Sequence, residues 1–251
     1  EAEDLSPEAM AERAVNLVPR LIMFVVTGNN LSSSTWNMAA AHAYIEKLRA
    51  KSFNNIKIMI WGLHPSALPE RTLNEEKVDF VCDGEGFYTL AALLENLNGD
   101  ASINDFRIPG LMYLRDGKFF SNGKARIVSN LDDLPLPAWD LLPMNKYRAH
   151  NWHCFQDIHN RQPYGVLYAS LGCPFNCSFC ALKALFENKP GIRYRSPLKV
   201  IEDIDHLVNK YKIKNIKLMD ECFVLKEDHV IKICDLIIER KYDLNIWAYS
   251  R

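Results

Sequence analysis

The chain alternates short continuous apolar runs with longer segments in which apolar residues recur at the helical period. Three such runs in the first half predict buried parallel strands, because strands covered on both faces are apolar at successive positions. They are LIMFVV (21–26), IKIMIWG (56–62) and VDFVCDG (78–84). The intervening periodicity predicts helices over 5–19, 36–50 and 87–97, the first capped by Ser6 with Pro7 at its first position. This alternation indicates an open parallel α/β sheet.

The pattern changes between about residues 105 and 160. LMYLRDGKFFSNG (111–123) predicts a hairpin around Asp116-Gly117, and LDDLPLPAWDLLP (131–143) is punctuated by proline and irregular. We interpret 105–160 as a linker that carries a small hairpin, which places one domain at 1–104 and another at 161–251. No internal repeat or low-complexity tract is evident.

Strand and helix patterns alternate again from residue 165. GVLYASLG (165–172), IKNIKLMDE (213–221) and LNIWAYSR (244–251) predict strands. Ser196 and Pro197 predict the start of a helix, and a second helix is expected over 227–240. Three strand–helix units fit in this half of the chain.

Composition narrows the class of protein. The 251 residues are 48% hydrophobic and 24% charged, as in a soluble globular protein, and the formal net charge is −1. This balance gives no electrostatic reason to expect nucleic acid or an anionic membrane as a partner. No apolar run reaches transmembrane length and no signal peptide is visible at the start, although the first residue is Glu1 rather than Met. We expect a cytoplasmic protein.

Cysteine usage points to a metal or redox site rather than a disulfide framework. The chain has 7 cysteines, an odd number in a chain that is not small, so a reducing compartment fits best. They are Cys82, Cys154, Cys173, Cys177, Cys180, Cys222 and Cys234. Three of them lie within CPFNCSFC (173–180), in a loop expected to leave a strand and enter a helix. Active sites gather at that edge of parallel α/β folds.

The spacing C-x3-C-x2-C supplies three thiolates where a structural zinc or iron–sulfur site takes four ligands. In a 4Fe–4S cluster, three cysteines leave one iron open to a substrate or cofactor. Three alternatives remain: a zinc site completed by a distant ligand such as His153 or Cys222, a four-ligand electron-transfer module, and cysteines with no joint role.

CPFNCSFC resembles the cysteine signature of radical S-adenosylmethionine (SAM) enzymes. The resemblance implies that Cys173, Cys177 and Cys180 hold a 4Fe–4S cluster and that Phe179 lies near the adenine of SAM. In that family SAM binds the open iron and is cleaved to a 5′-deoxyadenosyl radical, which abstracts hydrogen from the substrate. The protein holds the cofactor and shields it from water.

Later segments add further candidates for SAM contacts. RYRSPLKVIEDIDHL and IKLMDECF are similar to the segments that follow the cysteine loop in this family. Asp220 and Glu221, at a strand end, and Arg251, at the end of the next strand, are the candidate contacts. The alternatives are capping or surface carboxylates for the acids and a solvated terminal residue for Arg251. Arg193 and Arg195 are weaker candidates.

The first domain resembles the cobalamin-binding domain that precedes the radical domain in one branch of the family. The similarity rests on Gly62, His64 and Pro65, on Pro69-Glu70, and on 78–86, and DLPLPAWDLLP is similar to the bridge between the two domains. Candidate cobalamin contacts, all near strand ends, are Gly28, Ser32, Ser33, Gly62, His64 and Gly84. Their alternative is ordinary turn chemistry, and His64 fits a turn histidine better than a cobalt ligand.

The chain departs from that family pattern in two ways. Only three strands of the first sheet are evident where about five are usual, and the Asp-x-His-x-x-Gly motif that carries a cobalt ligand is absent. The resemblance therefore implies a Rossmann-like (flavodoxin-like) parallel sheet followed by the first half of a partial (β/α)6 radical SAM barrel. The sequence reads as part of a longer protein.

The expected function is that of a radical SAM enzyme, with cobalamin-dependent methyl transfer to a carbon or phosphorus centre or a related C–H functionalisation. Alternatives are a radical SAM enzyme without cobalamin and a non-catalytic iron–sulfur or metal-binding fragment; a tRNA-methylthiolating enzyme would bring a second cysteine set and a basic tail. The expected partners are a small-molecule substrate and an electron donor such as a flavodoxin or ferredoxin. His150, Trp152, His153 and Cys154 are interpreted as interdomain packing rather than as a lining between cofactors.

Overall fold

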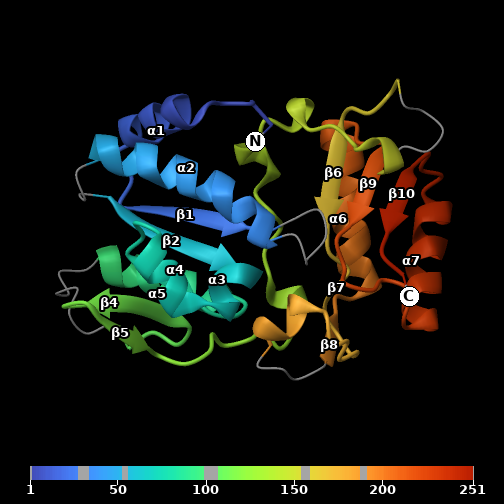
Figure 1. Ribbon diagram of the computed structural model, residues 1–251. Helices are drawn as coiled ribbons and strands as arrows, with labels where there is room; N and C mark the ends of the chain where they lie inside the picture. The colour runs from blue at the N-terminus through green and yellow to red at the C-terminus, as the bar shows by residue number, and fades with distance from the viewer. Residues whose placement is uncertain are drawn as a thin grey trace. The chain divides into compact units, whose positions relative to one another are not determined.

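The computed structural model describes residues 2–27, 34–52, 56–98, 107–153, 159–186 and 191–250. The chain forms two compact units, each of which is traced in Figure 1. The N-terminal unit comprises 5–128 and 175–190, and the C-terminal unit comprises 1–4, 129–174 and 191–251. Each unit is therefore built from segments that are separated along the chain.

The N-terminal unit is organised around a five-stranded sheet whose order follows the sequence. Its strands are β1 (Leu21–Val26), β2 (Lys57–Gly62), β3 (Phe80–Cys82), β4 (Leu111–Arg115) and β5 (Lys118–Ser121). The first three pair in parallel and the last two are antiparallel. The parallel strands confirm the prediction from the apolar runs.

The hairpin that the sequence analysis placed with the linker is part of this sheet. Val81 of β3 pairs with Met112 of β4, so the sheet has two strands beyond the three that are evident in the sequence. Asp116 and Gly117 turn the chain with φ of 50° and 72°, as expected of a two-residue hairpin. Short-range pattern predicted the hairpin, but its pairing with β3 depends on residues about thirty positions upstream.

Helices cover both faces of the five-stranded sheet. They are α1 (Pro7–Asn16), α2 (Ser34–Ser52), α3 (Leu63–Ala67), α4 (Pro69–Glu75) and α5 (Phe87–Asn98). The Ser6 side chain accepts a hydrogen bond from the amide of Ala9, which confirms the predicted cap of α1. The segment after β2, which we expected to be a turn, forms the two short helices α3 and α4.

Alternate residues of each strand enter two separate cores. Ile58, Ile60 and Val81 pack with apolar residues of α1, α2 and α4. Met59 and Phe80 face the opposite way and pack with Leu93 of α5. This period-two partition is what makes the parallel strands continuously apolar.

The C-terminal unit contains a parallel sheet of order β10-β9-β6. These strands are β6 (Tyr164–Leu167), β9 (Asn215–Leu218) and β10 (Asn245–Ala248), with α6 (Pro197–Tyr211) and α7 (Glu227–Glu239) between them in the chain. Leu167, Ile216 and Leu218 pack against the buried face of these two helices, so both helices cover one face of the sheet. The predicted alternation of three strands with two intervening helices is confirmed, and the whole fold is mixed α/β.

A second small sheet leads into the cysteine loop. It pairs β7 (Ser170–Cys173) with β8 (Gly191–Tyr194) in antiparallel register. The prediction of one strand over 165–172 is wrong, because the chain breaks between β6 and β7 at Tyr168 and Ala169. Between the cysteines and the helix predicted to begin at Ser196, which is present as α6, the chain forms the 3-10 turn η6 (Ala181–Ala184) and then β8.

The irregular segment that precedes β6 contributes to the C-terminal unit. It contains the 3-10 turns η2 (Leu131–Asp133), η3 (Trp139–Leu141), η4 (Met144–Lys146) and η5 (Asn151–His153). Within them, the buried Trp139 and Met144 side chains join the core formed with α6 and α7. The proline-punctuated stretch is thus packed structure rather than an open linker.

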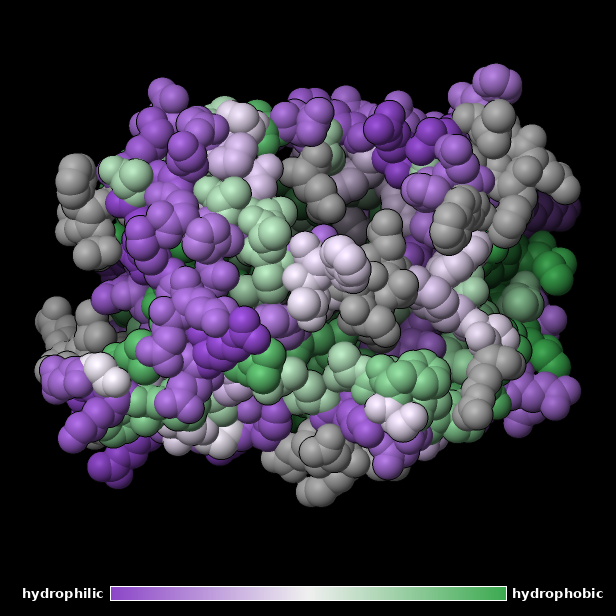
Figure 2. All heavy atoms as spheres, viewed as in Figure 1, coloured by the Kyte–Doolittle hydropathy of each residue, from purple (hydrophilic) through white to green (hydrophobic). Residues whose placement is uncertain are grey.

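The outer surface of the C-terminal unit carries apolar side chains along α7, visible as a green area over that helix in Figure 2. Ile231 and Ile238 contribute to it with 50% and 71% of their surface exposed. In the part of the chain that the structure describes, no helix is long and apolar enough to cross a membrane.

Candidate functional site

The cysteine loop begins at the end of β7. Cys173 is the last residue of that strand, and Cys177 and Cys180 follow in the loop, where the amide of Cys180 donates to the carbonyl of Cys177 over 3.1 Å. All three are free thiols with intermediate burial. Phe179, the predicted neighbour of the adenine, is 87% exposed. The loop thus presents soft sulfur ligands and an accessible aromatic ring, and sulfur is the donor that iron–sulfur clusters require.

No metal-binding group is preformed in the described residues. Across the ranges that the structure covers, no three His, Cys, Asp or Glu side chains are gathered as ligands of one ion. The assignment of Cys173, Cys177 and Cys180 as cluster ligands therefore stays a prediction that rests on their chemistry and spacing.

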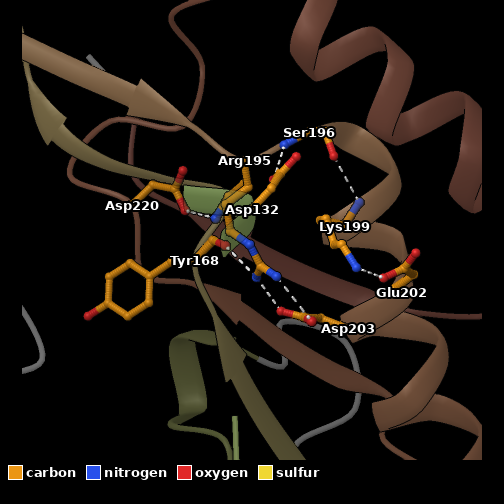
Figure 3. Close-up of polar contacts among 9 residues, drawn as sticks. Asp132, Tyr168, Arg195, Ser196, Lys199, Glu202, Asp203 and Asp220 are labelled. Atoms are coloured by element: carbon orange, nitrogen blue, oxygen red, sulfur yellow. Dashed lines mark hydrogen bonds and ion pairs between the residues drawn. The ribbon is translucent and has the colours of Figure 1, made fainter. Parts of the chain in front are cut away.

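Asp220 holds the backbone between β6 and β7, and Figure 3 shows a hydrogen bond to its carboxylate close to Tyr168. Its carboxylate is 0% exposed. It accepts hydrogen bonds from the amide of Ala169 over 2.8 Å and from the hydroxyl of Ser170 over 2.5 Å. Burial raises the pKa of Asp220, while these hydrogen bonds oppose the shift. The carboxylate of Asp220 thus stabilises the break between β6 and β7. Its contact with SAM stays a prediction.

Glu221 stabilises β7 at the residue directly before the cysteine loop. Its Oε2 atom accepts a hydrogen bond of 2.9 Å from the amide of Gly172, directly before Cys173. Burial raises the pKa of Glu221 to about 7, and the negative charge of Asp220 adds to this effect. Gly172 itself has φ of +92°, and an added Cβ would lie 2.4 Å from the carbonyl oxygen of Gly191, so this strand requires glycine there.

A buried ion pair connects the residue that follows β8 to α6 (Figure 3). The Arg195 guanidinium contacts both carboxylate oxygens of Asp203, with 3.3 Å between Nη2 and Oδ1, and both side chains are buried. Arg195 also donates to the carbonyl of Tyr168 over 3.4 Å. At the start of α6, the amide of Ser196 donates to Asp132 over 2.8 Å. The geometry makes Arg195 a positioning residue for the segment that follows the loop.

The segment after Cys180 is anchored within the N-terminal unit. The Nζ atom of Lys124, which lies just after β5, donates to the carbonyl of Ala184 in η6 over 2.6 Å. The same ammonium group pairs with the buried Asp83 carboxylate. Lys124 thus ties η6 to the end of β3, and sequence analysis missed it because nothing local marks a surface lysine as an anchor.

Gly62, one of the predicted cobalamin contacts, lies where β1 and β2 end together. It has φ of +150°, and an added Cβ would lie 2.1 Å from the carbonyl oxygen of Val26. Ser34 bridges the same two strand ends, because its hydroxyl donates to Val26 O over 2.6 Å and accepts from the amide of His64 over 3.1 Å. Close backbone packing at Gly62 thus accounts for its glycine, and its contact with cobalamin stays a prediction.

His64 and Gly84 lie near the same edge of the sheet. His64 is the second residue of α3, with its Nδ1 atom 3.1 Å from the Thr35 hydroxyl, and burial lowers the pKa of its imidazole. An added Cβ on Gly84 would lie 3.1 Å from the Cβ of Ala125, so this glycine also serves internal packing. The structure gathers these two residues with Gly62 at the carboxyl edge of the parallel strands, where ligands bind in open α/β sheets.

Four predicted site residues lie outside the described ranges. They are Gly28, Ser32, Ser33 and Arg251. Of the histidine-rich segment, Cys154 and the side chain of Trp152 are likewise outside them. His153 is described, and it stacks with Tyr164 and contacts Trp247 inside the C-terminal unit.

Comparison with known protein families supports the resemblance of the N-terminal unit to a cobalamin-binding domain. A family model described as "B12 binding domain" matches residues 3–94. The match includes β1, β2, β3 and the helices between them, the part of the unit in which Gly62, His64 and Gly84 lie.

The alignments with individual proteins extend over both units. The chain is 32% identical over 254 residues to "Uncharacterized methyltransferase PH0819" of Pyrococcus horikoshii, matching 100% of this chain and 50% of that protein. The structure is similar to the apo "Cobalamin-dependent S-adenosylmethionine radical enzyme OxsB", with TM-score 0.71, 18% identity, and coverage of 99% of this chain and 32% of that one. It is also similar to the radical SAM methyltransferase TsrM of Kitasatospora setae "with cobalamin and [4Fe-4S] cluster bound", with TM-score 0.70, 16% identity, and coverage of 99% and 47%. The chain thus spans half or less of the length of these proteins.

Proposed function

We propose that this chain belongs to the cobalamin-dependent branch of the radical SAM superfamily and that it carries the cofactor-binding machinery of a methyltransferase. In this proposal Cys173, Cys177 and Cys180 hold a 4Fe–4S cluster at which SAM is reductively cleaved, and the N-terminal unit holds cobalamin. The bound cluster supplies one-electron chemistry, and the protein supplies binding, orientation and exclusion of water.

The cysteine loop is the observation that carries the proposal. Its three thiols are free, and Cys173 ends a strand whose backbone is held by the buried carboxylate of Asp220 and the half-buried carboxylate of Glu221. Such support places one ligand on a rigid element and leaves the other two on the loop that follows. Glu221, at the end of β9, is the proposed acceptor for the SAM amino group, because a carboxylate forms charge-assisted hydrogen bonds with an ammonium.

Cobalamin is proposed at the carboxyl edge of β1, β2 and β3. The match to a B12-binding family over residues 3–94 supports this placement, as do the close-packed strand ends around Gly62. His64 is not proposed as a cobalt ligand, because the sequence lacks the Asp-x-His-x-x-Gly motif that carries one. Replacing His64 with Ala is expected to leave the optical spectrum of bound cobalamin unchanged.

Methyl transfer is the proposed reaction class because a relative that is 32% identical and matches the whole chain is a methyltransferase by name. A small-molecule substrate and a one-electron donor such as a flavodoxin or ferredoxin are the partners that this chemistry requires. The second candidate is a radical SAM enzyme whose N-terminal unit binds no cobalamin. Incubation with hydroxocobalamin followed by gel filtration separates the two, since retention of the cobalamin spectrum with the protein supports the first.

The decisive experiment is electron paramagnetic resonance of the anaerobically reconstituted and reduced chain, with and without SAM. We expect a 4Fe–4S signal that shifts when SAM is added, because SAM then binds the open iron. Cys177→Ala is expected to abolish the signal, and Cys234→Ala is the matched control because Cys234 is an exposed cysteine outside the loop.

Two outcomes would contradict the proposal. A cluster signal that does not respond to SAM would indicate a fourth protein ligand, and its recovery of SAM sensitivity in Cys222→Ser would identify that ligand. Stoichiometric zinc that survives in the absence of iron would instead indicate a structural zinc site.

A further inference from the structure

The turn η6 begins directly after Cys180 and is a short element. Cys180 is the residue before its first position, and the Leu182 side chain within it is buried. Hydrogen bonds of 3.0 and 3.2 Å join the amides of Leu185 and Phe186 to the carbonyls three residues earlier. A single 3-10 turn has little stability of its own, so its place depends on the structure that it contacts.

The end of β3 supplies those contacts within the N-terminal unit. The Nζ atom of Lys124 donates to the carbonyl of Ala184 over 2.6 Å and pairs with the carboxylate of Asp83. The Asp83 side chain is 5% exposed and that of Lys124 is 24% exposed, so the pair is largely shielded from water. A Cβ added to Gly84 would lie 3.5 Å from the carbonyl oxygen of Leu185. The turn therefore meets Asp83 through Lys124 and lies beside Gly84.

The same backbone belongs to the sheet edge at which cobalamin is proposed. Gly84 has φ of +107°, and its amide donates to the hydroxyl of Ser66 in α3 over 3.2 Å. The indole of Trp61 in β2 donates to the carbonyl of Gly84 over 2.5 Å. A ligand that restrains Gly84 at this edge thus restrains the backbone next to Asp83, whose carboxylate holds Lys124.

We propose that Lys124 is a positioning residue that couples cobalamin binding at this edge to the docking of η6, and so to the position of Cys180. The coupling rests on the proposed function, because it takes cobalamin as the ligand of the edge. Docked η6 needs the ammonium group between the Asp83 carboxylate and the Ala184 carbonyl, which requires the end of β3 to keep its conformation. A ligand that stabilises this conformation also stabilises the docked turn, and by linkage the docked turn strengthens ligand binding by the same factor.

Hydrogen–deuterium exchange of the full chain, with and without hydroxocobalamin, tests the coupling. Mass spectrometry follows the peptide that contains η6, and the visible spectrum after gel filtration measures the cobalamin that the chain retains. We expect saturating hydroxocobalamin to slow exchange in η6 at least about fivefold, the lower end of typical coupling between two sites. The peptide that contains α1, in the same unit, reports general stabilisation, and the effect on η6 is measured relative to it.

Matched variants assign the coupling to the ammonium group. Lys124→Met is expected to abolish the protection of η6 by hydroxocobalamin and to raise the Kd of hydroxocobalamin, from a spectral titration, by up to about fivefold. Lys124→Arg is expected to restore both, because a guanidinium also donates to carboxylate and carbonyl oxygens. Lys118→Met is the control, since Lys118 is an exposed lysine of the neighbouring strand β5. Circular dichroism checks that each variant is folded.

Two results would overturn the proposal while the proposed function stands. One is retained hydroxocobalamin that leaves exchange in η6 unchanged relative to α1, and the other is equal protection of η6 in folded Lys124→Met. Failure of the proposed function has a different signature, because the unmodified chain then retains no cobalamin after gel filtration. The coupling fails with it in that case, since the edge has lost its ligand.

Discussion

Glu221 offers the most direct test of how the strand behind the cysteine loop is stabilised. Its pKa is raised to about 7 from the usual 4.5, so between these values the folded chain holds a proton that the unfolded chain has lost. Stability that depends on the protonated form is therefore fully present below about pH 4.5 and is lost as the pH rises through about 7. Glu221→Gln removes this dependence and keeps an oxygen that accepts from the amide of Gly172.

The size of the effect follows from the pKa shift. A difference of this size corresponds to about 3.5 kcal/mol at most, since one pKa unit is worth about 1.4 kcal/mol. Glu221 is only partly buried, so solvent screening reduces the expected effect to about 1–2 kcal/mol. We expect Glu221→Gln to be as stable as the unmodified chain at pH 5 and more stable by this amount at pH 8.

Urea unfolding followed by far-ultraviolet circular dichroism at both pH values measures this difference. With a slope of roughly 2 kcal/mol per molar urea, the transition of the C-terminal unit should shift by about 0.5–1 M at pH 8. Glu227→Gln is the control, because Glu227 is an exposed carboxylate in the first turn of α7. Equal pH dependence in Glu221→Gln and the unmodified chain, or a less stable variant at pH 8, would refute the argument.

Three further predictions concern residues that hold segments in place within one unit or the other. Gly62→Ala should destabilise the chain by about 2–4 kcal/mol because its Cβ would meet a carbonyl oxygen at 2.1 Å, whereas Gly117→Ala, with open space around it, should cost only about 1–2 kcal/mol; urea midpoints compare them. Arg195→Met should cost about 3–5 kcal/mol by leaving Asp203 buried and unpaired, and the double variant with Asp203→Leu should recover most of that loss in the same assay. Lys124→Met should raise amide hydrogen exchange in η6 by about tenfold or more, since a charge-assisted hydrogen bond is lost; unchanged exchange would show that other contacts hold this turn.

Local pattern was sufficient for the elements whose signals lie within a few residues. The apolar runs predicted β1, β2 and β3, and the Ser6 and Ser196 caps fixed the starts of α1 and α6, because capping and periodicity act over one or two turns. The cysteine spacing raised the question of an open iron without any structure, since ligand number is a property of sequence and chemistry.

Pattern failed where an element depends on a distant partner. The run 165–172 predicts one continuous strand, but the buried carboxylate of Asp220 captures Ala169 and Ser170 and turns the chain there. The hairpin around Asp116-Gly117 was predicted, yet its place in the sheet depends on pairing with β3. Neither interaction can be predicted from the type or spacing of the residues next to it in the sequence.

Sequence by itself thus determined the fold class, the strand–helix alternation and the three thiols, because each is encoded by residue type and short spacing. Only the tertiary structure decided that Lys124 anchors η6 and that Asp220 supports the strand before Cys173. It alone brought Lys124 and Ala184 into contact, since these residues are 60 positions apart in the chain. The physical reason is that contacts between distant residues are set by strand register and chain topology, which no local periodicity specifies.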